Sequence, residues 1–205
     1  VFMIGFTGPG ADSTILSWIE EKRIGGVKIF GWNGTDLPRL ARAVGAMQKR
    51  AATTERGIPL FIATDQEGGW VRHVKGESSI TPGNMSIAAG GIPYDAVRTG
   101  ELIGRELRAL GINMNFAPTV DVYINPEAHV IGPRAFSSDP LQTGVLAQAF
   151  LYGMRSQGVI CTAKHFPGHG NADRDSHGSL PIIQDPLEVV MERDLLPYRM
   201  LIREG

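Results

Sequence analysis

The chain has 205 residues, enough for one well-cored domain, and its 20 Lys and Arg residues nearly balance its 21 Asp and Glu residues. This balance, without any run of like charge, argues against a nucleic-acid partner or a membrane-surface role, and no apolar run has the length of a membrane span. The single Cys161 excludes an internal disulfide and a cysteine zinc site, and it leaves the compartment open with the cytoplasm favoured.

Five short apolar runs, rich in β-branched residues, predict β-strands. Because each run is apolar almost throughout, we expect strands that are buried on both faces, as in a parallel sheet. The predicted strands span 1–6, 25–30, 59–66, 112–122 and 158–166.

Helical patterns alternate with these runs. The predicted helices span 12–23, 36–54, 94–111, 139–158 and 185–205. The last two start with Asp-Pro and finish on Gly, as expected when Pro lies just inside a helix start and Gly just past its end. A strand followed by a helix, five times over, predicts right-handed parallel βαβ units and an α/β fold.

Two α/β architectures fit this order, a doubly wound open sheet and a (β/α)8 barrel. Polar residues follow three different predicted strands, whereas an open sheet would gather them at one switch point. These residues are Asp65, Gln66, Glu67, Asn115, Asp121, Lys164 and His165. We therefore expect a TIM-type barrel with about five of its eight βα units, so that 1–205 is a single, incomplete catalytic barrel domain.

The segment TDQEGGWVRHV, 64–74, begins at a predicted strand end and breaks into a Gly-Gly turn. Asp65 is expected to point from the strand tip toward the barrel mouth, where a carboxylate accepts hydrogen bonds from neighbouring hydroxyls. Arg72 or His73 would add donors there. A purely structural role for Asp65 stays open, and for Glu67 we expect a turn cap.

The segment HVIGPRAFSSDP, 129–140, places Arg134 in a loop between Gly-Pro and Ser-Ser-Asp-Pro. Set among apolar neighbours, its guanidinium is predicted to be an anchored donor fork for an anionic or hydroxyl-rich ligand. The alternative is a solvated surface charge.

The segment KHFPGHGNADRDSH, 164–177, is the densest in titratable groups and invites comparison with a metal site. His165 and His169 are four residues apart, but Pro167 and Gly168 prevent the helix that would bring both rings onto one face. A metal site is therefore disfavoured, although a metal-dependent hydrolase stays open as an alternative.

The same segment suits proton transfer better. Asp175 and His177, two residues apart on a Gly-rich loop, can hydrogen-bond, which orients the imidazole for general acid and base catalysis. Lys164 and His165, at the predicted strand tip, offer a cation and a donor for substrate hydroxyls. A solvated polar loop is the alternative.

Four segments resemble, in the same order, blocks of glycoside hydrolase family 3, specifically its β-N-acetylglucosaminidase branch. They are DQEGG (65–69), NMNFAPTVDV (113–122), VIGPRAFSSDP (130–140) and AKHFPGHGNADRDSH (163–177). The resemblance covers essentially the whole chain, and its last block is the most specific. It implies a (β/α)8 barrel, no cofactor, and retention of anomeric configuration through a covalent glycosyl-aspartate.

By this resemblance, the acid/base histidine falls on His177 and its aspartate partner on Asp175. The substrate-binding positions fall on Asp65, His73, Arg134, Lys164 and His165. Many members carry an arginine where this chain has His73, so we expect that one substrate contact differs.

The family's nucleophile is an aspartate at a later strand tip, in a Ser/Thr-Asp-Asp-x-x-Met type of motif, and no Asp of the 205 residues matches it. We expect either a segment of a longer enzyme or an incomplete homologue. The predicted function is removal of terminal β-linked N-acetylglucosamine from a small saccharide, without cofactor or metal. A catalytically silent sugar-binding remnant is the alternative, and the natural substrate, hydrolysis against phosphorolysis, and the oligomeric state stay open.

Overall fold

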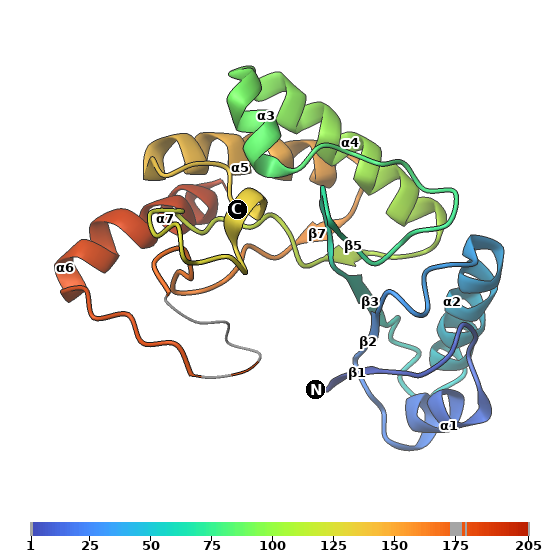
Figure 1. Cartoon of the computed structure of the whole chain (residues 1–205). Helices are drawn as coiled ribbons and strands as arrows, with labels where there is room; N and C mark the ends of the chain where they lie inside the picture. Colours follow the sequence, from blue (N-terminus) through green and yellow to red (C-terminus); the bar gives the residue numbers. More distant parts are fainter. Residues whose placement is uncertain (1, 173–177, 179, 205) are drawn as a thin grey trace.

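The computed structural model describes residues 2–172, 178 and 180–204. Its central feature is a five-stranded parallel sheet with the strand order β1-β2-β3-β6-β7 (Figure 1). The strands are β1 (Met3–Gly5), β2 (Gly26–Ile29), β3 (Phe61–Thr64), β6 (Met114–Asn115) and β7 (Ile160–Cys161). Each lies within one of the five predicted runs, so these predictions are confirmed, with shorter strands.

The strand order decides between the two architectures. Along this sheet the strands follow one another as they do in the chain, without the reversal that creates a switch point in a doubly wound sheet. Neighbours in a (β/α)8 barrel follow chain order in the same way. The fold is therefore α/β, and these strands form part of a barrel.

Four of the predicted helices are confirmed, and Figure 1 shows them in an arc around the strands. They are α1 (Ser13–Glu21), α2 (Leu37–Ala52), α4 (Pro93–Ala109) and α5 (Pro140–Ser156). The side chains of Asp12, Asp36 and Asp139 cap three of them by accepting hydrogen bonds from first-turn amides. Among the helices that the structure describes, none combines the length and apolarity that a bilayer crossing requires.

The helices α4 and α5 pack with their backbones in close contact. A Cβ added to Gly100 would lie 2.2 Å from the carbonyl oxygen of Phe150, and one added to Gly153 would lie 2.1 Å from that of Val97. Only glycine permits this approach. The pair forms a firm outer layer behind β6 and β7, whose carboxyl ends carry part of the candidate site.

The prediction of one continuous helix over 185–205 is wrong. The segment divides into α6 (Leu187–Val189), the π-helical turn η2 (Val190–Asp194) and α7 (Leu196–Arg203). The amide of Leu195 donates to the carbonyl of Val190, five residues back, and Pro197 has no N–H with which to continue the ladder. The helical pattern therefore restarts at the proline.

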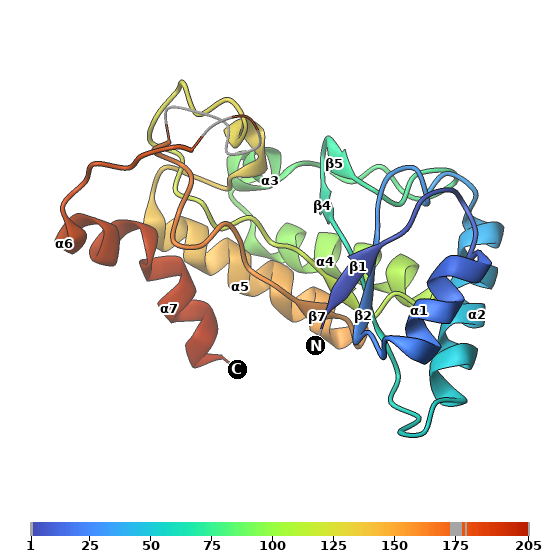
Figure 2. The ribbon, with the colours of Figure 1, turned by 90° about the horizontal axis from the view of Figure 1, so that it is seen from below.

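Three short elements were not predicted: the hairpin of β4 (Gln66–Gly68) and β5 (Val71–Arg72), helix α3 (Asn84–Gly90), and the 3-10 turn η1 (Gly132–Arg134). The hairpin directly follows β3 and extends past the end of the sheet (Figure 2). Its turn needs glycine, because Gly68 and Gly69 have φ of 92° and 57° and a Cβ on Gly68 would lie 2.8 Å from the carbonyl of Pro82. This hairpin fixes the position of Glu67.

Candidate active site

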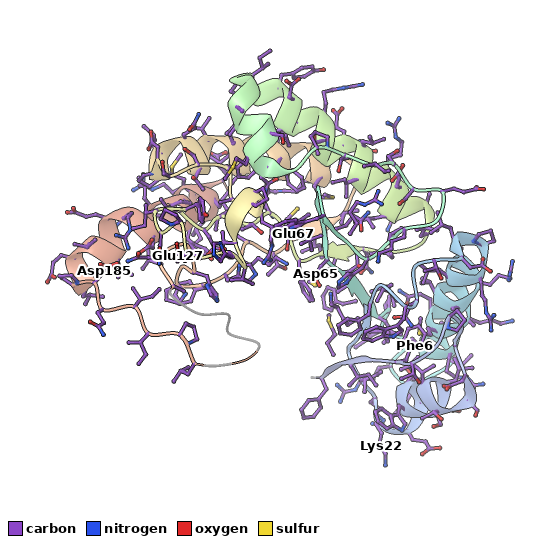
Figure 3. The ribbon with its side chains drawn as sticks, in the orientation of Figure 1. Phe6, Lys22, Asp65, Glu67, Glu127 and Asp185 are labelled. Carbon is purple, nitrogen blue, oxygen red and sulfur yellow. The ribbon has the colours of Figure 1, made fainter. Side chains whose placement is uncertain are left out.

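Charged side chains from several elements meet just past the carboxyl ends of the parallel strands, as expected for the active face of a barrel. Lys28 comes from β2, Asp65 and Glu67 follow β3, Asp121 follows β6, Lys164 and His165 follow β7, and Arg134 belongs to η1. Figure 3 shows Asp65 and Glu67 close together at the centre of the molecule, away from Asp185. We call these seven residues, together with His73, the ionic cluster.

Glu67 and Arg134 form an ion pair at the base of the ionic cluster. The guanidinium donates two hydrogen bonds of 2.9 Å, from Nε to Oε2 and from Nη2 to Oε1, and the hydroxyl of Thr119 donates a third of 3.1 Å to Oε2. The Glu67 side chain is 1% exposed. The expectation of a turn cap is wrong, because the carboxylate points inward and anchors the arginine.

Glu67 remains ionised despite this burial. Burial alone would raise the pKa of its carboxyl, but the hydrogen bond from Arg134 and the charge of Lys164 outweigh it and lower the pKa. A fixed negative charge therefore lies at the base of the ionic cluster, and it holds both cations in place.

Lys164 joins the two carboxylates. Its Nζ lies 2.6 Å from Oδ1 of Asp65 and 2.5 Å from Oε1 of Glu67. The backbone of Lys164 is fixed by a parallel bridge to Thr119, and its carbonyl accepts a 2.7 Å hydrogen bond from the amide of Val120. Burial lowers the pKa of Lys164 more than the Glu67 charge raises it.

His165 is held by two partners that determine its tautomer. Nδ1 lies 2.6 Å from Oδ2 of Asp121, and Nε2 lies 3.1 Å from Nη2 of Arg134. A guanidinium can only donate, so Nε2 accepts and the ring proton is on Nδ1. Asp121, fully buried, also accepts from the amide of His169 at 2.6 Å. These contacts therefore fix the orientation of the imidazole.

His73 lies on the other side of Asp65. Its Nδ1 is 3.4 Å from the carbonyl of Ile29 and 3.7 Å from Oδ2 of Asp65. Burial, aided by the nearby Lys28 ammonium, lowers the pKa of His73 to about 4. The imidazole is neutral near pH 7, unlike the arginine that the family resemblance expects at this position.

The structure thus brings together the predicted substrate-binding residues Asp65, His73, Arg134, Lys164 and His165, while the predicted catalytic pair Asp175 and His177 lies outside the described residues. The catalytic roles of Asp175 and His177 therefore stay predictions. Sequence reasoning missed Lys28 as a member of the site, it expected a turn cap for Glu67, and it placed Asp121 at the barrel mouth without a role. The signal for Lys28 was available, since it is the one charge within the apolar run 25–30.

Exposure divides the ionic cluster into two layers. The side chains of Glu67 and Asp121 are 1% and 0% exposed, whereas those of Asp65, Lys164 and His165 are 17%, 15% and 32% exposed. The buried carboxylates hold and orient the neighbouring side chains, and the outer groups present fixed donors and acceptors. Such an arrangement suits a neutral ligand rich in hydroxyl groups. Across the described ranges, no group of three or more His, Cys, Asp and Glu side chains is placed to hold a metal ion.

Comparisons with known proteins identify the family of the chain. The chain is 40% identical over 190 residues to the protein named Beta-hexosaminidase A of Pseudoalteromonas piscicida, covering 90% of this chain and 32% of that protein. The structure of a glycoside hydrolase family 3 beta-N-acetylglucosaminidase from Paenibacillus sp. str. FPU-7 matches with a TM-score of 0.95 and 37% identity, covering 99% of this chain and 38% of that one.

A third match is NagZ from Neisseria gonorrhoeae in complex with N-trifluoroacetyl-D-glucosamine, with a TM-score of 0.91 and 28% identity over 99% of this chain and 60% of that one. The chain therefore spans less than two thirds of the length of each of these relatives. The profile described as the Glycosyl hydrolase family 3 N terminal domain matches residues 7–205. By sequence and fold, the chain belongs to glycosyl hydrolase family 3.

Proposed function

We propose that the protein is a retaining β-N-acetylhexosaminidase, which removes terminal β-linked N-acetylglucosamine from a small saccharide. The observation that carries the proposal is the pairing of Asp65 with Lys164 at the outer layer of the ionic cluster. A carboxylate and an ammonium 2.6 Å apart, both partly exposed, present an acceptor and donors to adjacent hydroxyls of one sugar. The names of the family relatives support the choice of sugar.

In the proposed mechanism, His177 is the general acid and base, and Asp175 orients and polarises its imidazole. An aspartate nucleophile, which matches no Asp of the 205 residues, attacks the anomeric carbon while His177 gives its proton to the departing glycosidic oxygen. Neutral His177 then takes a proton from water, whose oxygen displaces the aspartate. Two inversions give net retention.

Histidine in place of a carboxylic acid has a further consequence. After giving up its proton, an imidazole is neutral, whereas a carboxylate would be negative and would repel an anion. The second step is therefore open to phosphate as an acceptor as well as to water. Product analysis in phosphate buffer, with the sugar phosphate separated from the free sugar, decides between the two.

The decisive experiment uses the full-length protein with aryl β-N-acetylglucosaminides. We expect release of the phenol and, by NMR, the β-anomer of N-acetylglucosamine as the first product. Binding of the sugar without turnover would favour a sugar-binding remnant instead. Activity that is lost to a chelator and restored by zinc would favour a metal-dependent hydrolase.

The acid role of His177 has its own test. His177→Ala is expected to slow substrates with poor leaving groups much more than those with good ones, because only the former need a proton at the departing oxygen. His129→Ala is the matched control, since the His129 side chain is 79% exposed and lies outside the ionic cluster. Equal slowing of both substrate classes would remove His177 from the acid role.

The cytoplasmic location also stays a proposal, which cell fractionation tests.

A further inference from the structure

We propose that Lys28 is a further substrate-binding residue, whose ammonium donates a hydrogen bond to a hydroxyl of the sugar that Asp65 also holds. The inference rests on the proposed function, because it names a contact made by that same substrate. Neither the family resemblance nor the predicted site includes a residue from the strand that carries Lys28.

The position of Lys28 in β2 directs its side chain into the barrel. Val27 and Ile29, its neighbours along the strand, belong to the hydrophobic core, and alternate residues of a strand face opposite sides. In the adjacent strands Lys28 pairs with Gly5 and Ala63, two of the smallest residues. The small neighbours leave room for the lysine stem to run along the inner face toward the carboxyl ends of the strands.

The ammonium of Lys28 is placed by three groups. It contacts Oδ2 of Asp65, and it lies 5.0 Å from the ring centroids of both Phe30 and Phe116, within the range of cation–π attraction. Lys164 binds Oδ1, the other oxygen of the same carboxylate, at 2.6 Å. Asp65 is therefore held between two ammonium groups, with its own two oxygens fixed in direction.

This arrangement leaves hydrogen-bonding capacity for a ligand. An ammonium has three donors, and within the described residues the only hydrogen-bond acceptor of Lys28 is Asp65. The faces of Phe30 and Phe116 attract the charge but do not replace strong acceptors. The Lys28 side chain is 11% exposed, close to the 15% of Lys164, and both ammonium groups contact the same carboxylate.

A purely structural role explains Lys28 poorly. Lys164 already gives Asp65 one ion pair, and burying a second ammonium in an apolar strand carries a desolvation penalty that an apolar residue would avoid. His73, on the same side of Asp65, is neutral because its pKa is lowered to about 4. On that side of Asp65, Lys28 is the cation in direct contact with the carboxylate.

The test is steady-state kinetics of the full-length protein with Lys28→Met, which keeps an unbranched side chain one atom shorter and removes the charge. Lys28→Gln is the second variant, since it keeps a donor and gives a foldable alternative if the Met variant is unstable. Lys49→Met on α2 is the matched control, because Lys49 is exposed and lies away from the ionic cluster. Circular dichroism melts check that each variant is folded.

We expect KM for an aryl β-N-acetylglucosaminide to rise roughly ten- to hundredfold in Lys28→Met, as when a hydrogen bond to a charged group is lost, with kcat changed by less than about threefold. The rise in KM should be smaller in Lys28→Gln, and the KM of Lys49→Met should match that of the wild type. Substrates lacking single hydroxyls locate the contact. For one of these monodeoxy glycosides, the wild type and Lys28→Met should have nearly equal KM.

An unchanged KM in Lys28→Met, or the same penalty on every monodeoxy substrate, would overturn the role of Lys28 while leaving the proposed function intact. If the wild type hydrolyses no substrate, calorimetric titration with N-acetylglucosamine decides instead. Weaker binding by Lys28→Met then supports the contact, equal binding overturns it, and absence of binding by the wild type overturns the contact and the proposed function together.

Discussion

Arg134 and Glu67 are 67 residues apart in the chain, and the structure joins them by two parallel hydrogen bonds of 2.9 Å. The guanidinium also donates 2.7 Å to the carbonyl of Val130, in its own loop. Glu67 therefore ties the loop of η1 to the hairpin after β3, and it holds Lys164 by a second ion pair. Removal of its charge should loosen both cations at once.

For Glu67→Gln we predict a loss of stability of about 2–4 kcal/mol and a higher KM, because two buried cations lose their shared counter-charge. Urea unfolding and steady-state kinetics measure the two effects. Glu20→Gln is the matched control, since the Glu20 side chain is 54% exposed in its pair with Arg50, and surface pairs contribute roughly 0–1 kcal/mol. Similar losses in both variants would contradict the buried role of Glu67.

The contacts of His165 predict a single neutral tautomer. In ¹⁵N NMR of the wild type, Nδ1 should be protonated and Nε2 unprotonated near pH 7, because Asp121 accepts from the first and Arg134 donates to the second. Asp121→Asn should disturb this preference and lower kcat/KM by roughly 10- to 100-fold, as expected when a residue that orients a site histidine is removed.

The same NMR experiment supplies the outcome that would contradict the assignment. A wild-type spectrum in which Nε2 carries the proton would mean that the guanidinium does not donate to the ring. An unchanged His165 spectrum in Asp121→Asn would mean that the carboxylate does not set the tautomer.

Lys28 predicts a dependence of stability on pH. Burial and the neighbouring Lys164 charge lower the pKa of Lys28 from 10.5 to about 7, with Glu67 opposing, and the ammonium is in contact with Asp65. Between these values the unfolded chain keeps a proton that the folded chain releases, so the Lys28 contribution to the free energy of unfolding rises with pH. Conversely, this contribution falls as the pH drops from 10.5 toward 7.

Urea unfolding of the wild type and Lys28→Met at several pH values between 7 and 8.5 measures this contribution. We expect the free energy of unfolding of the wild type, relative to that of Lys28→Met, to increase as the pH rises. A difference that is independent of pH would show that Lys28 stays charged throughout the range.

His73 predicts a second, separate pH window. Its pKa falls from 6.5 to about 4 in the folded chain, chiefly because of burial. Between these values the unfolded chain binds a proton that the folded chain does not bind. The wild type should therefore lose stability between pH 6.5 and 4, and His73→Gln should lose less in the same window. Thermal melts across this range provide the measurement, and parallel losses in both proteins would contradict the prediction.

The sequence alone determined the parts of the fold that depend on local pattern. Continuous apolar runs with intervening helical periods identified all five strands of the parallel sheet, and the predicted helices 12–23 and 36–54 start at the Asp residues that cap α1 and α2. The residues at the strand ends followed directly, because the carboxyl ends of parallel strands lie at one edge. Asp65 and Lys164 were therefore predictable members of one site.

Only the tertiary structure decided which of these charges pair and which are buried. Glu67 resembled a turn cap because its partner Arg134 lies on a distant loop, and no local pattern specifies a contact across 67 residues. The charge of Lys28 within an apolar run is visible in the sequence, but its contacts are not, since they depend on the ring faces and the carboxylate that surround it. Strand and helix propensities act over a few residues, whereas desolvation and ion pairing depend on the complete packing around each charge.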